Sequence, residues 1–390
     1  VREVLVKKSK KFQKPFNVKF ATRTLNIENL FSSDGELWEK LRKVMQPAFH
    51  TRRISAYVDT MREYSVEIIN GWESGKEIDT PNEMMNLTLA TTTRALFGKD
   101  MRNDEAGDAI IRFIELFFDR ITKFPIPAWV PTSKNSAIKG ELKTIFDWLT
   151  PLIEERKEDP QAFDDIMAML IEAQQIDESS LLTDRQISNE VANLFAAGYE
   201  VVAHTLVFTL YLVSQHPEVR EKIDEELRRV VKDEPISLAH IGQLTYLEMV
   251  LKESMRLLPV TTVLTRQTSE RVELGGYILP KDRLILFAPW TLQRNEAHFP
   301  DALAFKPERF HPETGDAYHR YTYLPFSSGP RVCIGNAFSM LQMKINLATI
   351  WQRFDLTFPD DAVFEPTYSF NTRPKNGLPL IVKEKTHAFG

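Results

Sequence analysis

The segment Phe326-Ser327-Ser328-Gly329-Pro330-Arg331-Val332-Cys333-Ile334-Gly335 contains the only cysteine of a chain of 390 residues. Gly329 and Pro330 predict a turn before the cysteine, and apolar residues at helical spacing follow it: Ala337, Phe338, Met340, Leu341 and Met343. We therefore expect Cys333 at, or just before, the N-terminus of a helix. There the free N–H groups and the helix dipole favour a thiolate, which is a good metal ligand, over a thiol.

Three neighbours of Cys333 suit a flat ligand that carries negative charge. Gly335 has no side chain, so such a ligand could lie close to the backbone. Arg331 could meet an anionic group on it, and Phe326 could cover the sulfur and exclude water. A lone cysteine is more often a small buried core residue than a ligand.

This segment resembles the haem-ligand loop of the cytochrome P450 family, whose pattern is Phe-x-x-Gly-x-Arg-x-Cys-x-Gly. Every fixed position of the pattern is met, which argues against a merely structural cysteine. The resemblance implies that haem b is the cofactor, that Cys333 is the thiolate ligand of its iron, and that Phe326, Arg331 and Gly335 contact it.

Residues outside the loop are assigned to the haem propionates by the same resemblance. Trp38 and Arg42 are four residues apart on a predicted helix, so they share a face and match the Trp-x-x-x-Arg variant of the family. Arg266 would meet the other propionate. For Trp38 and Arg42 taken alone, a packed tryptophan beside a surface arginine is the simpler alternative.

Residues 183–216 predict the longest helix, with a capping box at Thr183 and Gln186. Glu200 is its only formal charge between residues 191 and 213, a composition that raises the alternative of a membrane span. Asn193, His204 and further hydroxyl side chains are too many polar groups for a lipid-facing helix. We therefore expect a buried central helix and no membrane segment within this chain.

Within this helix, Ala197-Gly198-Tyr199-Glu200 resembles the family motif Ala/Gly-Gly-x-Asp/Glu-Thr. The resemblance implies that Ala197 and Gly198 lie against the cofactor, and that Glu200 and the next residue are catalytic. In the family that next residue is a threonine that helps deliver protons. Here Val201 replaces it, and valine has no hydroxyl to donate. Thr205, one turn further on, is expected to lie too far away to replace it.

Glu253, Arg256 and Arg309 match a family network, Glu-x-x-Arg with a downstream arginine, that braces the cysteine side of the haem. Taken alone, a glutamate and an arginine three residues apart are most often a surface ion pair. The resemblance also assigns substrate contacts, which we place at Phe195, Val260, Val263 and Phe370.

The resemblance implies a mainly α fold. We expect a single large helical domain over residues 1–390 with a small mixed β-sheet, and the haem between the long central helix and the helix after Cys333. Family members usually begin with a further helix and the first strands of the sheet, which this sequence lacks.

Composition limits the classes of partner. The chain is 43% hydrophobic and has a net charge of -5, so nothing in it indicates nucleic-acid binding. One cysteine excludes an intrachain disulfide and fits a reducing compartment, so we expect a cytoplasmic protein. The basic residues Lys40, Lys43, Arg52 and Arg53 form either a solvated helix face or a docking surface for an acidic redox partner.

The sequence therefore predicts a haem-thiolate monooxygenase that inserts one oxygen atom from O2 into an apolar small molecule: a fatty acid, terpenoid, carotenoid or polyketide. No flavin or dinucleotide motif is present, so electrons would come from a separate ferredoxin, or from a flavodoxin and reductase. Val201 leaves two other enzymes open, a redox-independent isomerase and a peroxide-driven hydroxylase. A haem protein that binds ligands without catalysis is the third alternative.

Overall fold

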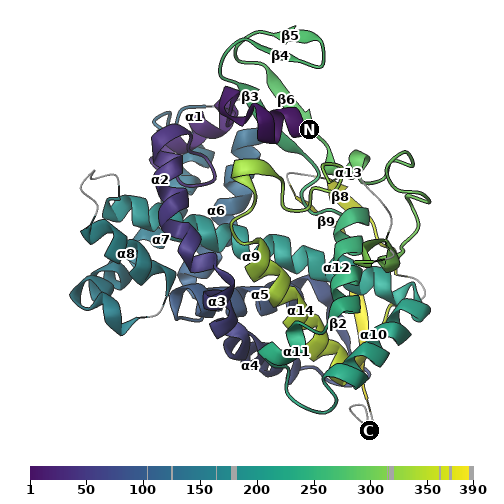
Figure 1. Cartoon of the computed structure of the whole chain (residues 1–390). Helices are drawn as coiled ribbons and strands as arrows, with labels where there is room; N and C mark the ends of the chain where they lie inside the picture. The colour runs from purple at the N-terminus through teal and green to yellow at the C-terminus, as the bar shows by residue number, and fades with distance from the viewer. Residues whose placement is uncertain are drawn as a thin grey trace.

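Helix α9 (Asp184–Ser214) runs through the middle of the molecule, with the other long helices packed around it (Figure 1). It has 31 residues and begins where the Thr183 hydroxyl accepts the N–H of Gln186. Of the two hydrogen bonds of the expected capping box, only this one forms. The Gln186 amide instead donates to the Glu28 carbonyl and to the Glu190 carboxyl group.

The structure, a computed structural model, describes residues 1–102, 104–123, 126–163, 165–176, 182–313, 315, 320–359, 362–368 and 371–385. Its other α-helices are α1 (Phe16–Leu25), α2 (Gly35–Met45), α3 (Thr51–Ile54), α4 (Val58–Ile69), α5 (Thr80–Phe97), α6 (Glu105–Thr122), α7 (Ser133–Glu158), α8 (Ile166–Gln175), α10 (Pro217–Val230), α11 (Leu238–Ile241), α12 (Thr245–Leu257), α13 (Pro289–Leu292) and α14 (Asn336–Arg353). Short helical turns are η1 (Glu3–Lys7), η2 (Ser9–Lys11), η3 (Gln46–Phe49), η4 (Ser55–Tyr57), η5 (Pro160–Ala162), η6 (Pro307–Phe310) and η7 (Gly329–Arg331).

The strands are short and lie at the margin of the helical body. They are β1 (Phe12–Gln13), β2 (Glu77–Asp79), β3 (Leu264–Thr268), β4 (Val272–Leu274), β5 (Tyr277–Leu279), β6 (Leu284–Phe287), β7 (Phe354–Thr357), β8 (Pro366–Tyr368), β9 (Thr372–Pro374) and β10 (Pro379–Glu384). The strand orders are β1-β3-β6, β2-β10-β7, β4-β5 and β8-β9, and every described pair is antiparallel. The mainly α fold class is thus confirmed, but these four antiparallel sheets replace the single mixed sheet that we expected.

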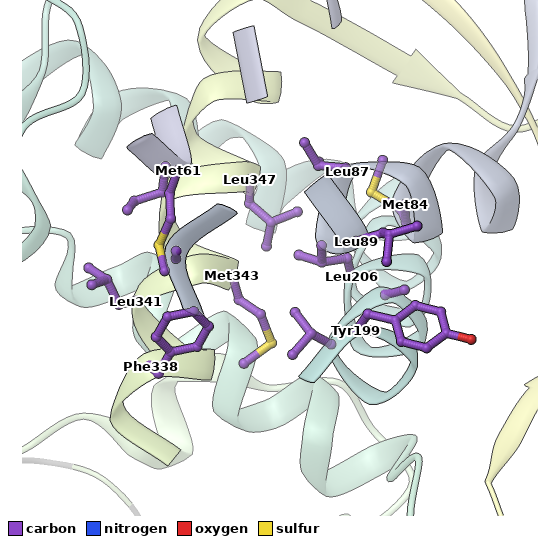
Figure 2. Packing of buried hydrophobic residues seen from close by; sticks show 14 of the residues in the cluster. Met61, Met84, Leu87, Leu89, Tyr199, Leu206, Phe338, Leu341, Met343 and Leu347 are labelled. Carbon is purple, nitrogen blue, oxygen red and sulfur yellow. The ribbon is translucent and has the colours of Figure 1, made fainter. Parts of the chain in front are cut away.

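The core lies where α4, α5, α9 and α14 meet. Figure 2 shows Met61, Leu87, Leu206, Phe338 and Met343 converging from these four helices. Met61, Leu87 and Leu206 are fully buried, and truncating one such side chain typically costs about 2–5 kcal/mol of folding free energy. This packing fixes α9 relative to α14, the helix that follows Cys333.

Among the described helices, α9 alone is long and apolar enough to cross a membrane. In its most apolar window, 67% of the residues are buried inside the protein. This burial agrees with the central helix that the sequence predicted.

Candidate active site

The Cys333 loop is a tight turn that lies between turn η1 and the start of α14. The N–H of Cys333 donates to the Phe326 carbonyl, 2.9 Å away. Gly329 has a φ of +76°, and a Cβ there would lie 1.9 Å from the carbonyl oxygen of Leu5, so only glycine fits. Turn η1 thus packs on the loop, and α14 begins three residues after the cysteine with Gly335 as its N-cap.

Cys333 faces an interior cavity of ≈ 400 Å³. The Cys333 side chain is open to the space of the cavity, but protein surrounds the cavity and shields the sulfur from bulk water. Burial raises the pKa of the Cys333 thiol above its ordinary value, and the Gly335 N–H and the Arg42 charge offset only part of this rise. The helix terminus thus favours the thiolate, as expected, but burial outweighs this contribution in the polypeptide alone. Deprotonation would come with metal binding.

One wall of the cavity is the middle of α9. Ala197, Glu200, Val201 and Thr205 all line the cavity. Thr205 lies one helical turn beyond Val201 on the same face, and its hydroxyl donates to the Val201 carbonyl at 2.8 Å. That it cannot replace the missing hydroxyl of Val201 stays a prediction.

Gly198 has a packing role that the sequence did not predict, and its contact with the cofactor stays a prediction. A Cβ on Gly198 would lie 2.8 Å from Cγ2 of Thr92, and the Thr92 hydroxyl donates to the Gly198 carbonyl at 3.2 Å. The glycine therefore allows α9 to pack closely on α5. It is not among the residues that line the cavity in the described part of the chain.

The Glu200 carboxyl group lies between the cavity and a buried polar region. The Asn371 amide donates to its Oε2 at 3.3 Å, and Nδ1 of His204 lies 4.0 Å from its Oε1. Burial raises the pKa of Glu200, and the Asn371 amide and the Arg373 charge oppose that rise. Burial also lowers the pKa of His204 to about 4, so its imidazole is neutral near pH 7.

A cationic cluster at the cavity edge gathers Lys14, Arg266 and Arg331 around the single carboxylate of Asp34. Arg331 Nη2 lies 2.5 Å from Asp34 Oδ1, and the three cations line the cavity. Burial and mutual repulsion lower the pKa of Lys14 to about 7 and that of Arg266 to about 10. An excess of positive charge over Asp34 suits a ligand with two carboxylates. Sequence reasoning found Arg266 and Arg331 but missed Lys14, which no local motif marks.

Trp38 and Arg42 lie behind the Cys333 loop, and neither lines the cavity in the described structure. Arg42 donates to the Val332 carbonyl at 2.9 Å, and the Arg331 guanidinium lies 4.5 Å from the centre of the Trp38 ring. Their direct contact with a propionate stays a prediction. The positions observed here brace the loop and orient Arg331.

The expected three-residue network is present and fully buried. Arg256 donates to both carboxyl oxygens of Glu253 at 2.6 and 2.8 Å, and Arg309 Nε donates to Glu253 Oε1 at 3.2 Å. The remaining Arg256 donors bind the backbone carbonyls of Gln293, Ala302 and Ala304. The network therefore ties α12 to the segment that leads to the Cys333 loop.

The predicted substrate contacts have different outcomes. Val260 and Val263 line the cavity. Phe195 is buried and packs edge-on against Tyr199, and it is not part of the described lining. Phe370 lies outside the described residues. The main apolar wall was not assigned from sequence: it is formed by Phe113, Phe117 and Phe118 of α6 and by Phe146 of α7.

Comparison with known proteins agrees with this geometry. A family model described as Cytochrome P450 matches residues 1–381. Cytochrome P450 4V2 of Mus musculus is 30% identical over 98% of this chain and 78% of its own length. Cyclooctatin synthase of Streptomyces melanosporofaciens is 30% identical over 86% of this chain and 74% of its own length. The solved structure titled retinoic acid bound cyanobacterial CYP120A1 has a TM-score of 0.87 at 22% identity, covering 98% of this chain and 87% of that one.

Proposed function

The chain belongs to the cytochrome P450 family, whose members are haem-dependent monooxygenases, and from this premise we propose that it inserts one oxygen atom from O2 into an apolar small molecule. Fatty acids, terpenoids, carotenoids and polyketides are the proposed substrate classes. The observation that carries the proposal is a single cavity lined by the only cysteine, by a cationic cluster and by an aromatic wall.

The proposed cofactor is haem b, since the chain has no second cysteine for covalent attachment. Cys333 would ligate the iron, and Lys14, Arg266 and Arg331 would meet the propionates. Ala197 lines the cavity and its methyl group leaves room for the flat ring system, and Phe326 lines the cavity as well. Gly335 is not among the described lining residues, so its contact with the cofactor stays a prediction. Haem with a thiolate ligand supplies oxygen activation, because the thiolate donates electron density to the iron.

In the proposed mechanism, Glu200 is the proton-holding group of the cavity wall. Its raised pKa keeps a larger share of the carboxyl group protonated near neutral pH than in water, and the Asn371 amide orients it. Val201 beside it carries no hydroxyl and presents an apolar surface that discourages ordered water. Protons would then leave Glu200 through a substrate hydroxyl or carbonyl group.

Electrons would come from a separate ferredoxin, or from a flavodoxin and reductase. Family members generally need such a partner, but the type of partner stays a prediction. A cytoplasmic location also stays a prediction, supported by the single cysteine.

The test combines a spectrum with isotope labelling. Reduced protein with carbon monoxide should show the red-shifted band of thiolate-ligated haem, and Cys333→Ala should lose it. With electrons supplied under 18O2, a product should contain one 18O atom. A band that survives in Cys333→Ala would contradict the haem assignment.

The isomerase is the second candidate function, and Val201 is the observation that favours it, because an isomerase needs no proton relay. It predicts product without an electron donor and without 18O. Binding without product under either condition would indicate a haem protein that only carries or senses ligands.

A further inference from the structure

A second hollow of ≈ 370 Å³ lies on the surface where α1, α7 and α9 meet. Four charged side chains line it: Lys139, Lys143 and Asp147 of α7 and Arg185 of α9. We call these four residues and the space between them the cationic pocket. No motif in the sequence marks it, and the residues assigned above to the haem and to catalysis do not line it.

The cationic pocket and the cavity of Cys333 share a wall. Leu142 and Phe146 line both spaces, so two side chains separate the surface hollow from the aromatic end of the cavity. The Arg185 guanidinium lies 3.7 Å from the centre of the Phe146 ring. A rotation of the Phe146 side chain would therefore join a charged site to an apolar channel that ends at Cys333.

The charges in the pocket do not balance. Asp147 pairs with Lys143, whereas neither Lys139 nor Arg185 has a carboxylate within ion-pair distance among the described residues. Burial lowers the pKa of Arg185, whose Nε donates to the Asn26 carbonyl at 3.2 Å. An anion would relieve this excess of two positive charges over the described residues.

A buried arginine behind the cationic pocket adds to its excess of positive charge. Arg120 is 8% exposed and donates at 3.3 Å to the hydroxyl of Thr24, which lines the pocket. Its other bonds go to the Asn135 amide oxygen and the Ile126 carbonyl, and its Nε has no partner. The described residues place no carboxylate beside this guanidinium, so its charge also favours an anion in this part of the molecule.

From these observations we propose that the cationic pocket binds the carboxylate of an elongated substrate whose apolar body extends past Phe146 into the cavity. The carboxylate would lie between Lys139, Lys143 and Arg185. The apolar body would contact the phenylalanines of α6, and the end far from the carboxylate would approach Cys333. This inference rests on the proposed function and narrows it to long-chain acids oxidised away from their acid group.

The experiment measures the binding of palmitate and of its neutral methyl ester to the haem-loaded full chain, by spectral titration and by calorimetry. In Lys139→Gln/Lys143→Gln, palmitate should bind about fivefold more weakly, in keeping with the loss of two exposed charge contacts. Methyl palmitate should bind as it does to the wild type. Asp147→Asn should change palmitate affinity in the opposite direction, because it removes the one negative charge of the pocket.

The matched control is Lys281→Gln/Lys383→Gln, which removes two exposed charges from the β5–β6 turn and from β10. It should leave the affinity for both ligands unchanged. The proposal is overturned if acid and ester weaken equally, if neither changes in Lys139→Gln/Lys143→Gln, or if neither binds the wild type. Incorporation of one 18O atom into any other apolar small molecule, alongside any of these results, would leave the proposed monooxygenase function standing, so the two failures are distinguishable.

Discussion

Val201 removes the hydroxyl that helps deliver protons in the family motif, because its side chain is an isopropyl group. Thr205 lines the same cavity, but its hydroxyl already donates to the Val201 carbonyl. Glu200 is thus the acidic group that α9 offers to the cavity, and its proton needs a carrier.

Val201→Thr should raise the fraction of electrons that end in product when the substrate has no hydroxyl or carbonyl group, by about two- to fivefold, since positioned proton transfer is worth large factors. The measurement is product formed per equivalent of electron donor consumed. Val263→Thr adds a hydroxyl to another part of the cavity wall and serves as the control. If the wild type already forms about one product per equivalent of electron donor with a plain hydrocarbon, this account is contradicted.

The first turns of α9 are hydrogen-bonded to the segment between α1 and α2. The Glu190 carboxyl group accepts the N–H of Leu30 at 3.0 Å, and Asn189 donates to the Glu28 carbonyl at 3.1 Å. Asn29 and Phe31 of this segment line the cavity. The N-terminal end of α9 therefore shapes the cavity far from its catalytic turn.

Burial raises the pKa of Glu190 to about 8, against an ordinary value of 4.5, although the Leu30 N–H and the Gln186 amide oppose the rise. A raised pKa in the folded state contributes stability that is present below pH 4.5 and is lost as the pH rises to about 8. Glu190→Gln should therefore lose less stability than the wild type between pH 5 and pH 8. The substitution removes about 2.303RT per pH unit from the fall of the unfolding free energy with pH.

Thermal unfolding of the two proteins across this pH range measures the difference. Glu218→Gln, which changes an exposed glutamate of α10, should keep the wild-type dependence on pH. Parallel curves for wild type and Glu190→Gln would show that Glu190 is ionised in the folded protein.

The network of Glu253, Arg256 and Arg309 couples α12 to the segment before the Cys333 loop. Alanine at any of the three should cost about 3–5 kcal/mol, because the remaining charges stay buried without a partner. The expected result is poorly folded protein without haem, measured as haem absorbance per mole of soluble chain. Lys222→Ala breaks the half-exposed pair with Glu308 and should cost no more than about 1 kcal/mol. Stable holoprotein from all three network variants would contradict the role as a brace.

What the sequence predicted correctly is local. The Cys333 loop and the start of α9 are recognisable because their residues lie within a few positions of one another. Lys14 and Asn371 reach the site only through tertiary packing, as do the phenylalanines of α6, and no short pattern marks them. The packing role of Gly198 was missed because its close neighbour, Thr92, lies more than 100 positions earlier in the chain. The pKa of Cys333 was misjudged because desolvation depends on the whole surrounding fold.

Four basic residues lie on α2 and α3, and α2 also contacts the Cys333 loop through Arg42. α2 and α3 carry Lys40, Lys43, Arg52 and Arg53, of which Lys43 and Arg52 are exposed. Arg42, on the same helix as Lys43, is bonded to the Val332 carbonyl beside Cys333. An electron donor bound here would be separated from the sulfur by little more than α2 and the loop.

We expect an acidic electron donor to use this surface. The rate of electron transfer should fall about tenfold between 10 and 200 mM salt, because the Debye length shrinks from about 30 Å to less than 8 Å over that range. Lys43→Gln/Arg52→Gln should raise the KM for the donor and flatten the salt dependence, while substrate binding stays unchanged. Lys383→Gln, an exposed charge on β10, is the control. A rate independent of salt, or equal effects of the control and the double variant, would show that the donor docks elsewhere.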